Sequence, residues 1–110
     1  MKPFSFLLIL FLIVFSTCEK NPKETPECIK AKIETYSFCE KGGTVTQYSF
    51  QGQLVYVFYL GSCRGIDSSA DVYNENCECI GILGGIAGNN IINNELFIGN
   101  AKLIKTIWSN

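Results

Sequence analysis

The chain contains no histidine, a single arginine and no run of like charges. Without histidine, the usual general base for a serine or cysteine nucleophile is missing, so a catalytic triad is not expected. Nine basic residues against 10 acidic ones leave a net charge of −1 and no basic patch that would favour nucleic acid. We therefore expect a protein that is not an enzyme, has no cofactor and has no nucleic-acid partner.

The longest apolar run is too short to cross a membrane. It extends from Phe4 to Phe15, 12 residues broken only by Ser5, whereas a membrane-spanning helix needs roughly 17–25 residues. Its length, and the short positive head that contains Lys2, are typical of the apolar region of a secretory signal peptide. The pattern predicts export, with residues 1–17 as the signal peptide.

Cys18 follows this run at the end of the stretch Phe15-Ser16-Thr17-Cys18. Ordinary signal peptidase needs a small residue three positions before the cut, where this stretch has phenylalanine. The stretch resembles a bacterial lipobox instead, so we expect lipidation of Cys18; a cut nearby that leaves Cys18 as a free thiol is the alternative. The polar, proline-containing residues 18–25 then form a lipid-anchored linker. This organisation predicts a membrane partner through the anchor and a place in the cell envelope, at the outer membrane.

The rest of the chain predicts one helix followed by strands. Thr25-Pro26-Glu27 is a favourable helix start, and Ile29, Ile33 and Tyr36 then lie on one stripe of a helix over Glu27–Phe38. Lys30, Lys32 and Glu34 lie off that stripe. After Gly42-Gly43 the chain is rich in β-branched and aromatic residues, which favour strands. The predicted strands are Thr44–Phe50, Gln53–Leu60, Ala70–Tyr73, Cys77–Leu83 and two short strands within residues 95–108.

These elements predict an α+β fold: one N-terminal helix packed on a small antiparallel β-sheet, stapled by disulfides, in a single domain over residues 26–110. The strand Gln53–Leu60 is apolar on both faces, so it is expected to be central and covered on both sides. Ile29 and Ile33 of the helix are expected to pack on it.

Five cysteines remain in the exported domain, and disulfides are expected because a small core needs covalent support. On a continuous helix Cys28 and Cys39 are roughly 16 Å apart, too far to pair, and they point the same way. Each is therefore expected to bond with Cys63, Cys77 or Cys79, which leaves one thiol over or joined to another chain. Cys77 and Cys79 are two residues apart, on one face of a regular strand. A metal site is not expected, since Cys77-Glu78-Cys79 lacks zinc-knuckle spacing.

Other candidate residues favour structural roles. The carboxylate pairs Asp67 with Asp71 and Glu75 with Glu78 are explained by loop and turn solvation. Gly84, Gly85 and Gly88 match neither a dinucleotide-binding nor a phosphate-binding motif, so they indicate turn geometry. The aromatic residues on the strands are read as core or sheet face, namely Tyr48, Phe50, Tyr56, Phe58 and Tyr59.

Several segments together resemble a family of small Bacteroidota lipoproteins classed as a domain of unknown function. The similarity covers roughly Pro26 to Gly88. It is carried by the opening Cys-Ile-x-x-Lys-Ile, by the Val-Tyr strand before the cysteine loop, and by DVYNENCECIG ahead of Gly-Gly-Ile. Members often carry an aspartate before that Gly-Gly, where this chain has Leu83, so a cation site there is not expected. The resemblance implies a localisation and a shape, and no activity.

The function expected from these observations is that of an uncharacterised cell-envelope lipoprotein with a non-catalytic binding or structural role. Its protein or glycan partner is left open. The alternative is a secreted module similar to a protease inhibitor, which acts through the Cys63–Asp67 loop with Arg64 as the exposed basic side chain.

Overall fold

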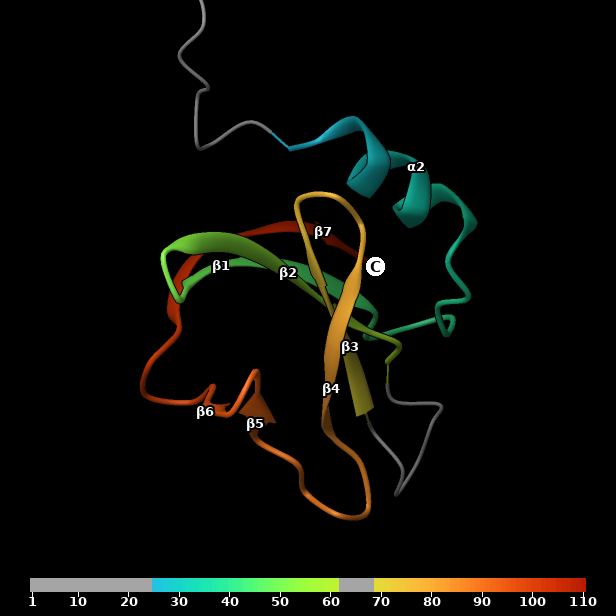
Figure 1. The fold of residues 1–110 in the computed structure, drawn as a ribbon. Helices are drawn as coiled ribbons and strands as arrows, with labels where there is room; N and C mark the ends of the chain where they lie inside the picture. Colours follow the sequence, from blue (N-terminus) through green and yellow to red (C-terminus); the bar gives the residue numbers. More distant parts are fainter. Residues whose placement is uncertain (1–24, 62–68) are drawn as a thin grey trace, which may run out of the picture.

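The computed structural model describes residues 25–61 and 69–110. Strands make up 49% of that part of the chain and helix makes up 11%. All strand pairs are antiparallel, and five strands form one sheet in the order β4-β3-β2-β1-β7, while β5 and β6 form a separate small hairpin (Figure 1). The elements are α2 (Glu27–Thr35), β1 (Thr44–Phe50), β2 (Gln53–Tyr59), β3 (Ser69–Asn74), β4 (Cys79–Gly84), β5 (Ile91–Ile92), β6 (Glu95–Leu96) and β7 (Lys102–Ser109).

The predicted α+β fold class is wrong, because the structure is a mostly antiparallel β fold that carries one short helix. Two segments account for the difference. The helix ends at Thr35 and not at Phe38, and the C-terminal residues, whose pattern suits helix or strand, form the eight-residue strand β7 on the edge of the sheet. Within the described residues, no helix is long and apolar enough to span a bilayer.

Helix α2 begins at Glu27, as its sequence predicts, but its N-cap is Pro26 and not Thr25. Pro26 is the N-cap, and its carbonyl oxygen accepts hydrogen bonds from the backbone amides of Ile29 and Lys30, both at 3.1 Å. Thr25 therefore lies before the cap. Proline suits this position because it has no amide hydrogen to leave unpaired.

The helix ends where aromatic side chains turn towards the sheet. Tyr36 is extended, with φ −73° and ψ 142°. Its ring centroid lies 4.9 Å from that of Phe58, and the ring of Phe38 lies 4.1 Å from that of Trp108. Packing of large aromatic rings outweighs one further turn of a short helix, which contributes little on its own. Cys39 therefore lies well beyond the end of the helix, and the continuous-helix geometry used for the distance between Cys28 and Cys39 does not hold.

The β1–β2 hairpin is confirmed, with β2 one residue shorter than predicted. Its turn residues, Gln51 and Gly52, have φ angles of 52° and 74°. Positive φ at both central residues is the pattern of a type I′ turn, whose twist matches that of antiparallel strands. The hairpin sets the register Thr44 to Tyr59 and Phe50 to Gln53.

Strand β7 contains bulges that change which side chains share a face. Val45 pairs with Trp108 and Thr46 pairs with Thr106, which leaves Ile107 as an extra residue. In a regular strand Ile107 and Trp108 would point to opposite faces. The bulge lets both pack against the core on the helix side of the sheet.

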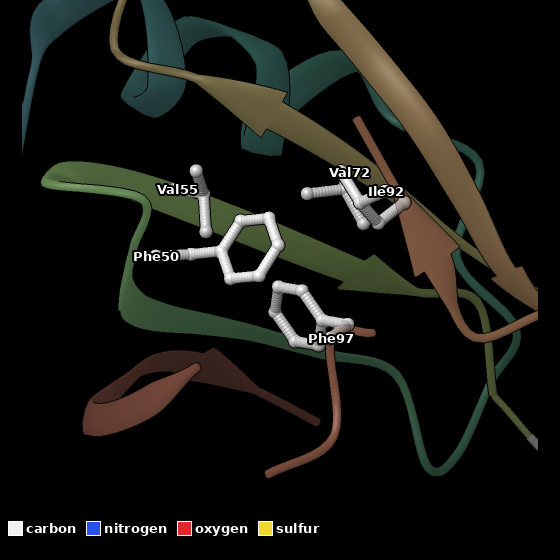
Figure 2. Close-up of a cluster of buried hydrophobic side chains, with 5 residues drawn as sticks. All are labelled: Phe50, Val55, Val72, Ile92 and Phe97. Carbon is white, nitrogen blue, oxygen red and sulfur yellow. The ribbon is translucent and has the colours of Figure 1, made fainter. Parts of the chain in front are cut away.

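Strand β2 is buried on both faces, as its sequence predicts. On the helix side, Tyr56 and Phe58 pack with Ile29 and Val45. On the other side, Val55 belongs to a second core (Figure 2). This core is covered by the segment 85–101, which includes the β5–β6 hairpin. The buried residues of that second core are Phe50, Val55, Val72, Ile92 and Phe97.

The helix stripe is narrower than its sequence suggests. Ile29 is completely buried, whereas Ile33 is only partly buried. Lys32, which the sequence places off the stripe, contacts the sheet as well, since its Nζ lies 4.4 Å from the centroid of the Tyr73 ring. On the sheet, the helix therefore packs through a buried Ile29, a partly buried Ile33 and a cation–π contact of Lys32.

Replacement of Ile29 by alanine is expected to lower the free energy of unfolding by about 2–5 kcal/mol, the usual cost of emptying a buried isoleucine site. Lys30→Ala is the matched control on the same helix. Its side chain is 54% exposed and makes only a 3.6 Å surface ion pair with Glu27, so its loss should change stability by no more than about 0.5 kcal/mol. Urea unfolding of the two variants measures both values, and equal costs would contradict the packing described.

Candidate functional site

Part of the functional prediction concerns residues outside the described structure. Cys18, with its predicted lipid, lies there, and so do Arg64 and Asp67. The Cys63–Asp67 loop of the inhibitor alternative lies within residues 62–68, which the structure does not describe. The candidate sites below are built from the described residues alone.

A disulfide joins helix α2 to the turn between β3 and β4. Cys28 bonds to Cys77 across 49 residues of sequence, with 6.1 Å between their Cα atoms. Cys77 is among the three partners that the sequence analysis allowed for Cys28. Cys39 is disulfide-bonded too, and the prediction that concerns Cys63 lies outside the described residues.

The prediction that Cys77 and Cys79 lie on one face of a strand is wrong. Cys77 lies in the β3–β4 turn with φ +63°, a left-handed conformation that few residues other than glycine adopt. Cys79 is the first residue of β4, pairs with Tyr73, and is a free, exposed thiol. Cys77 in the turn therefore forms the disulfide with Cys28, whereas Cys79 at the start of β4 remains a free thiol.

Tyr36 and Asp71 form the polar centre of an aromatic row between the helix end and the sheet. The Tyr36 hydroxyl donates a hydrogen bond to Oδ2 of Asp71, which lies in the middle of β3. Burial raises the pKa of Tyr36 well above its ordinary value, and the hydrogen bond to Asp71 and the negative charge of that carboxylate raise it further. Burial, followed by the Asp71 charge, raises the pKa of Tyr73 as well. This arrangement keeps the tyrosines protonated and orients the chain that leaves α2.

Of the carboxylates that the sequence analysis paired, Glu75 and Glu78 lie at the β3–β4 turn, whereas Asp71 lies within β3 and bonds to Tyr36, so loop solvation does not explain Asp71. The Oε1 atom of Glu78 accepts a hydrogen bond of 2.9 Å from Nδ2 of Asn74. Asn74 Oδ1 in turn accepts hydrogen bonds from the backbone amides of Asn76 and Glu78, so these residues build the β3–β4 turn. In residues 25–61 and 69–110, no three histidine, cysteine, aspartate or glutamate side chains gather as a metal site would need.

An apolar hollow lies on the side of the sheet opposite the helix, and the sequence analysis missed it. Its volume is about 320 Å³, within the range of roughly 300–1,000 Å³ in which small binding sites fall. Leu83 of β4 and Ile98 supply its large apolar side chains. The complete lining is Ala70, Leu83, Gly84, Gly88, Asn89, Asn90 and Ile98.

The glycines that the sequence assigned to turn geometry shape one wall of this hollow. Gly84, Gly85 and Gly88 have φ angles of 76°, 77° and 64°, which glycine adopts without steric cost. The turn closes through a hydrogen bond of 3.1 Å from the Gly88 amide to the Gly85 carbonyl. The isoleucines that surround the glycines were the available signal, but only the tertiary structure shows that they face outward.

The asparagine side chains at the rim bond to the protein itself. Nδ2 of Asn89 donates to the carbonyl oxygens of Ile82 and Ile91, at 2.5 and 3.2 Å. Oδ1 of Asn90 accepts a hydrogen bond of 3.0 Å from the amide of Ile98. Because the Asn89 amide and the oxygen of the Asn90 amide are used internally, most of the hydrogen-bonding capacity at the rim is taken, and the hollow suits an apolar occupant better than a polar one.

Comparison with known proteins identifies a family without assigning an activity. A family model described as "Domain of unknown function (DUF6970)" matches residues 19–110. No curated protein and no solved structure matches the chain.

Removal of the Cys28–Cys77 disulfide in a Cys28→Ser/Cys77→Ser variant is expected to lower the free energy of unfolding by about 2–5 kcal/mol, because the unfolded chain loses a cross-link. The control is Cys79→Ser, which removes an exposed free thiol and should cost no more than about 0.5 kcal/mol. Urea unfolding in the absence of reductant gives both numbers. A Cys79 variant as unstable as the double variant would show that Cys79 also carries structure.

The raised tyrosine pKa values predict alkaline destabilisation. Tyrosines ionise near pH 10 in the unfolded chain and at higher pH in the folded one, so the folded state holds more protons above about pH 10 and its stability falls as the pH rises further. Tyr36→Phe should weaken this dependence and should cost about 1–3 kcal/mol at neutral pH, where Asp71 loses a partly buried donor. Urea unfolding between about pH 9 and pH 11, in a Cys79→Ser background that prevents disulfide exchange, is the measurement. Parallel curves for the variant and its parent would contradict the role of Tyr36.

Proposed function

We propose that this chain, which belongs to the DUF6970 family of domains of unknown function, is a non-catalytic lipoprotein of the cell envelope that binds a protein partner. The lipid on Cys18 tethers it, and the apolar hollow beside Ile98 is its binding surface. The observation that carries the proposal is the position of that hollow. It lies on the face of the sheet opposite the helix through which the tether enters.

The N-terminal sequence supports the tether. The apolar run Phe4–Phe15 is followed by the lipobox-like stretch that ends at Cys18, which is the order of segments expected of a lipoprotein precursor. Residues 18–24 extend at most about 25 Å at roughly 3.3–3.6 Å per residue. The domain is therefore held close to the outer membrane by the end that leads into α2.

The two faces of the sheet support a division of roles. The helix side contains Ile29, the Tyr36–Asp71 hydrogen bond and the Cys28–Cys77 disulfide, all of which hold α2 in place. The opposite side contains the segment 85–101, and the hollow lies between this segment and strands β3 and β4. Figure 1 shows α2 at the top of the view and the β5–β6 region in its lower part. A tethered domain of this form presents the hollow away from its attachment.

The sheet edges favour binding by side chains over binding by strand addition. At the β4 edge, the backbone amides of Gly84 and Asn89 each donate a hydrogen bond to the carbonyl oxygen of the other residue. The Asn89 side chain also donates to the Ile82 carbonyl oxygen. The β7 edge carries Lys102 and Lys105 together with two bulges. Both devices discourage the addition of a further strand.

The chemistry of the hollow favours a protein over a glycan. Sugars are held by several converging hydrogen-bonding groups, whereas at this rim the Asn89 amide and the Asn90 Oδ1 atom bond to the chain itself. An aliphatic side chain of a partner protein would instead gain free energy by burial against Leu83 and Ile98. The net negative charge of the protein disfavours nucleic acid.

Cys18→Ala is expected to release the protein from the membrane fraction or to leave an uncut precursor, since the cysteine that receives the lipid is gone. Cys79→Ala is the matched control, because it removes an exposed thiol and leaves the lipobox intact. Fractionation of cells, with mass spectrometry of the mature N-terminus, distinguishes the outcomes. An unmodified Cys18 on the mature wild-type protein would overturn the proposal.

A further inference from the structure

We infer that three cysteines at the β3–β4 turn form a thiol–disulfide switch, in which the free thiol of Cys79 bonds to Cys77 and releases Cys28. The exchange removes the covalent link between helix α2 and the sheet, and the number of disulfides stays the same. Figure 1 shows this turn directly beneath α2. The switch goes beyond the proposed binding function and depends on neither the lipid nor the hollow.

The free thiol and the disulfide lie on the same side of the sheet. Cys79 pairs directly with Tyr73, and the side chains of directly paired residues in an antiparallel ladder share a face. The Tyr73 side chain packs in the helix-side core, together with Cys28 and Cys77. Burial, then the charge of Asp71 and then that of an ionised Cys79 raise the pKa of Tyr73, which places the thiol near the Tyr73 side chain.

The sulfur of Cys77 is within reach of Cys79 along the chain. One residue separates them, so their Cα atoms are at most about 7 Å apart, close to the upper limit of about 6.8 Å that a disulfide usually spans. A connection that is slightly less than fully extended therefore suffices. Cys77 is half-buried and Cys79 is exposed, so neither residue is enclosed in the core.

The β3–β4 turn is held by hydrogen bonds that do not depend on the disulfide. Oδ1 of Asn74 accepts hydrogen bonds from the backbone amides of Asn76 and Glu78, and the Asn74 amide donates one of 3.0 Å to the Glu78 carbonyl oxygen. The Cys77 amide donates another, also of 3.0 Å, to the Asn74 carbonyl oxygen. These four bonds involve no sulfur atom, so they persist when Cys77 changes its partner, and β3 and β4 stay in register.

The exchange balances within the chain. Cys79 loses its proton to water, and the resulting thiolate attacks the Sγ atom of Cys77. The bond between Cys77 and Cys79 forms as the bond between Cys77 and Cys28 breaks. The electron pair of the broken bond leaves on the Sγ atom of Cys28, which takes a proton from water. The step consumes no oxidant and no reductant.

The released thiol of Cys28 has a hydrogen-bond acceptor where it stands. The Cys28 sulfur lies 3.3 Å from the carbonyl oxygen of Glu75, and a thiol hydrogen can be donated to that oxygen. Helix α2 then depends on non-covalent contacts, among them the burial of Ile29 and the Tyr36–Asp71 hydrogen bond. A helix of nine residues has little stability of its own, so the exchange loosens the attachment of α2 to the sheet.

The test follows the thiols of the full-length protein, purified at about pH 5, where thiols are protonated and exchange is slow. The protein is brought to about pH 8, and samples are stopped at successive times with excess N-ethylmaleimide. Tryptic peptides are then analysed by mass spectrometry without reduction. The maleimide is expected on Cys79 at the start and on Cys28 within hours. The peptide that contains Cys77 and Cys79 should then carry an internal disulfide, formed at a rate that does not depend on protein concentration.

Cys79→Ser is the matched control, because it lacks the attacking thiol, and labelling of Cys28 should fall at least about tenfold. An unchanged melting temperature shows that the variant is folded. Cys28 that stays unlabelled in the parent protein overturns the inference, and so does equal labelling of Cys28 in the variant. A rate that rises with protein concentration also overturns it, because the exchange then occurs between molecules. Maleimide on Cys18 reports an unlipidated anchor separately, so failure of the proposed function and failure of the switch are distinguishable.

Discussion

Burial of β2 on both faces is the constraint on which the rest of the structure depends. Side chains alternate along a strand, so Tyr56 and Phe58 point to one side of the sheet and Val55 points to the other. As the central strand it has neighbours on each edge, and both of its apolar faces need a cover. Helix α2 with the chain after it covers one face, and the segment 85–101 covers the other. The order of elements follows from this requirement, because a small domain has no other material for the second layer.

The two covers are held by different physical means. A nine-residue helix has little stability of its own, and α2 is fixed by the Cys28–Cys77 disulfide, by Ile29 and by the Tyr36–Asp71 hydrogen bond. The other cover has almost no regular structure beyond the two-residue strands β5 and β6. It is held by Ile92 and Phe97 in the core and by backbone turns that depend on glycine and asparagine.

This difference explains where a binding surface arises. Side chains on the helix side of the sheet contact one another, so this face of the sheet is occupied by the contacts that hold α2. The irregular cover sends Ile92 and Phe97 inward and leaves its other large side chains, among them Ile86 and Ile98, directed outward. A short loop that alternates in this way cannot close over the sheet completely, and the hollow beside Leu83 is the space that remains.

The sequence by itself determined the elements whose signals are local. The apolar, β-branched run of β2 and the turn at Gln51-Gly52 specify a central hairpin, and the proline before Glu27 specifies where the helix begins. The tertiary structure decided the end of that helix, because the gain of packing Tyr36 on Phe58 comes from a strand more than twenty residues away. It also decided that residues 102–109 are a strand, since their pattern suits either state until β1 provides an edge. The hollow is a property of the same kind. No single residue specifies it, and it exists only where β4, the glycine turn and Ile98 meet.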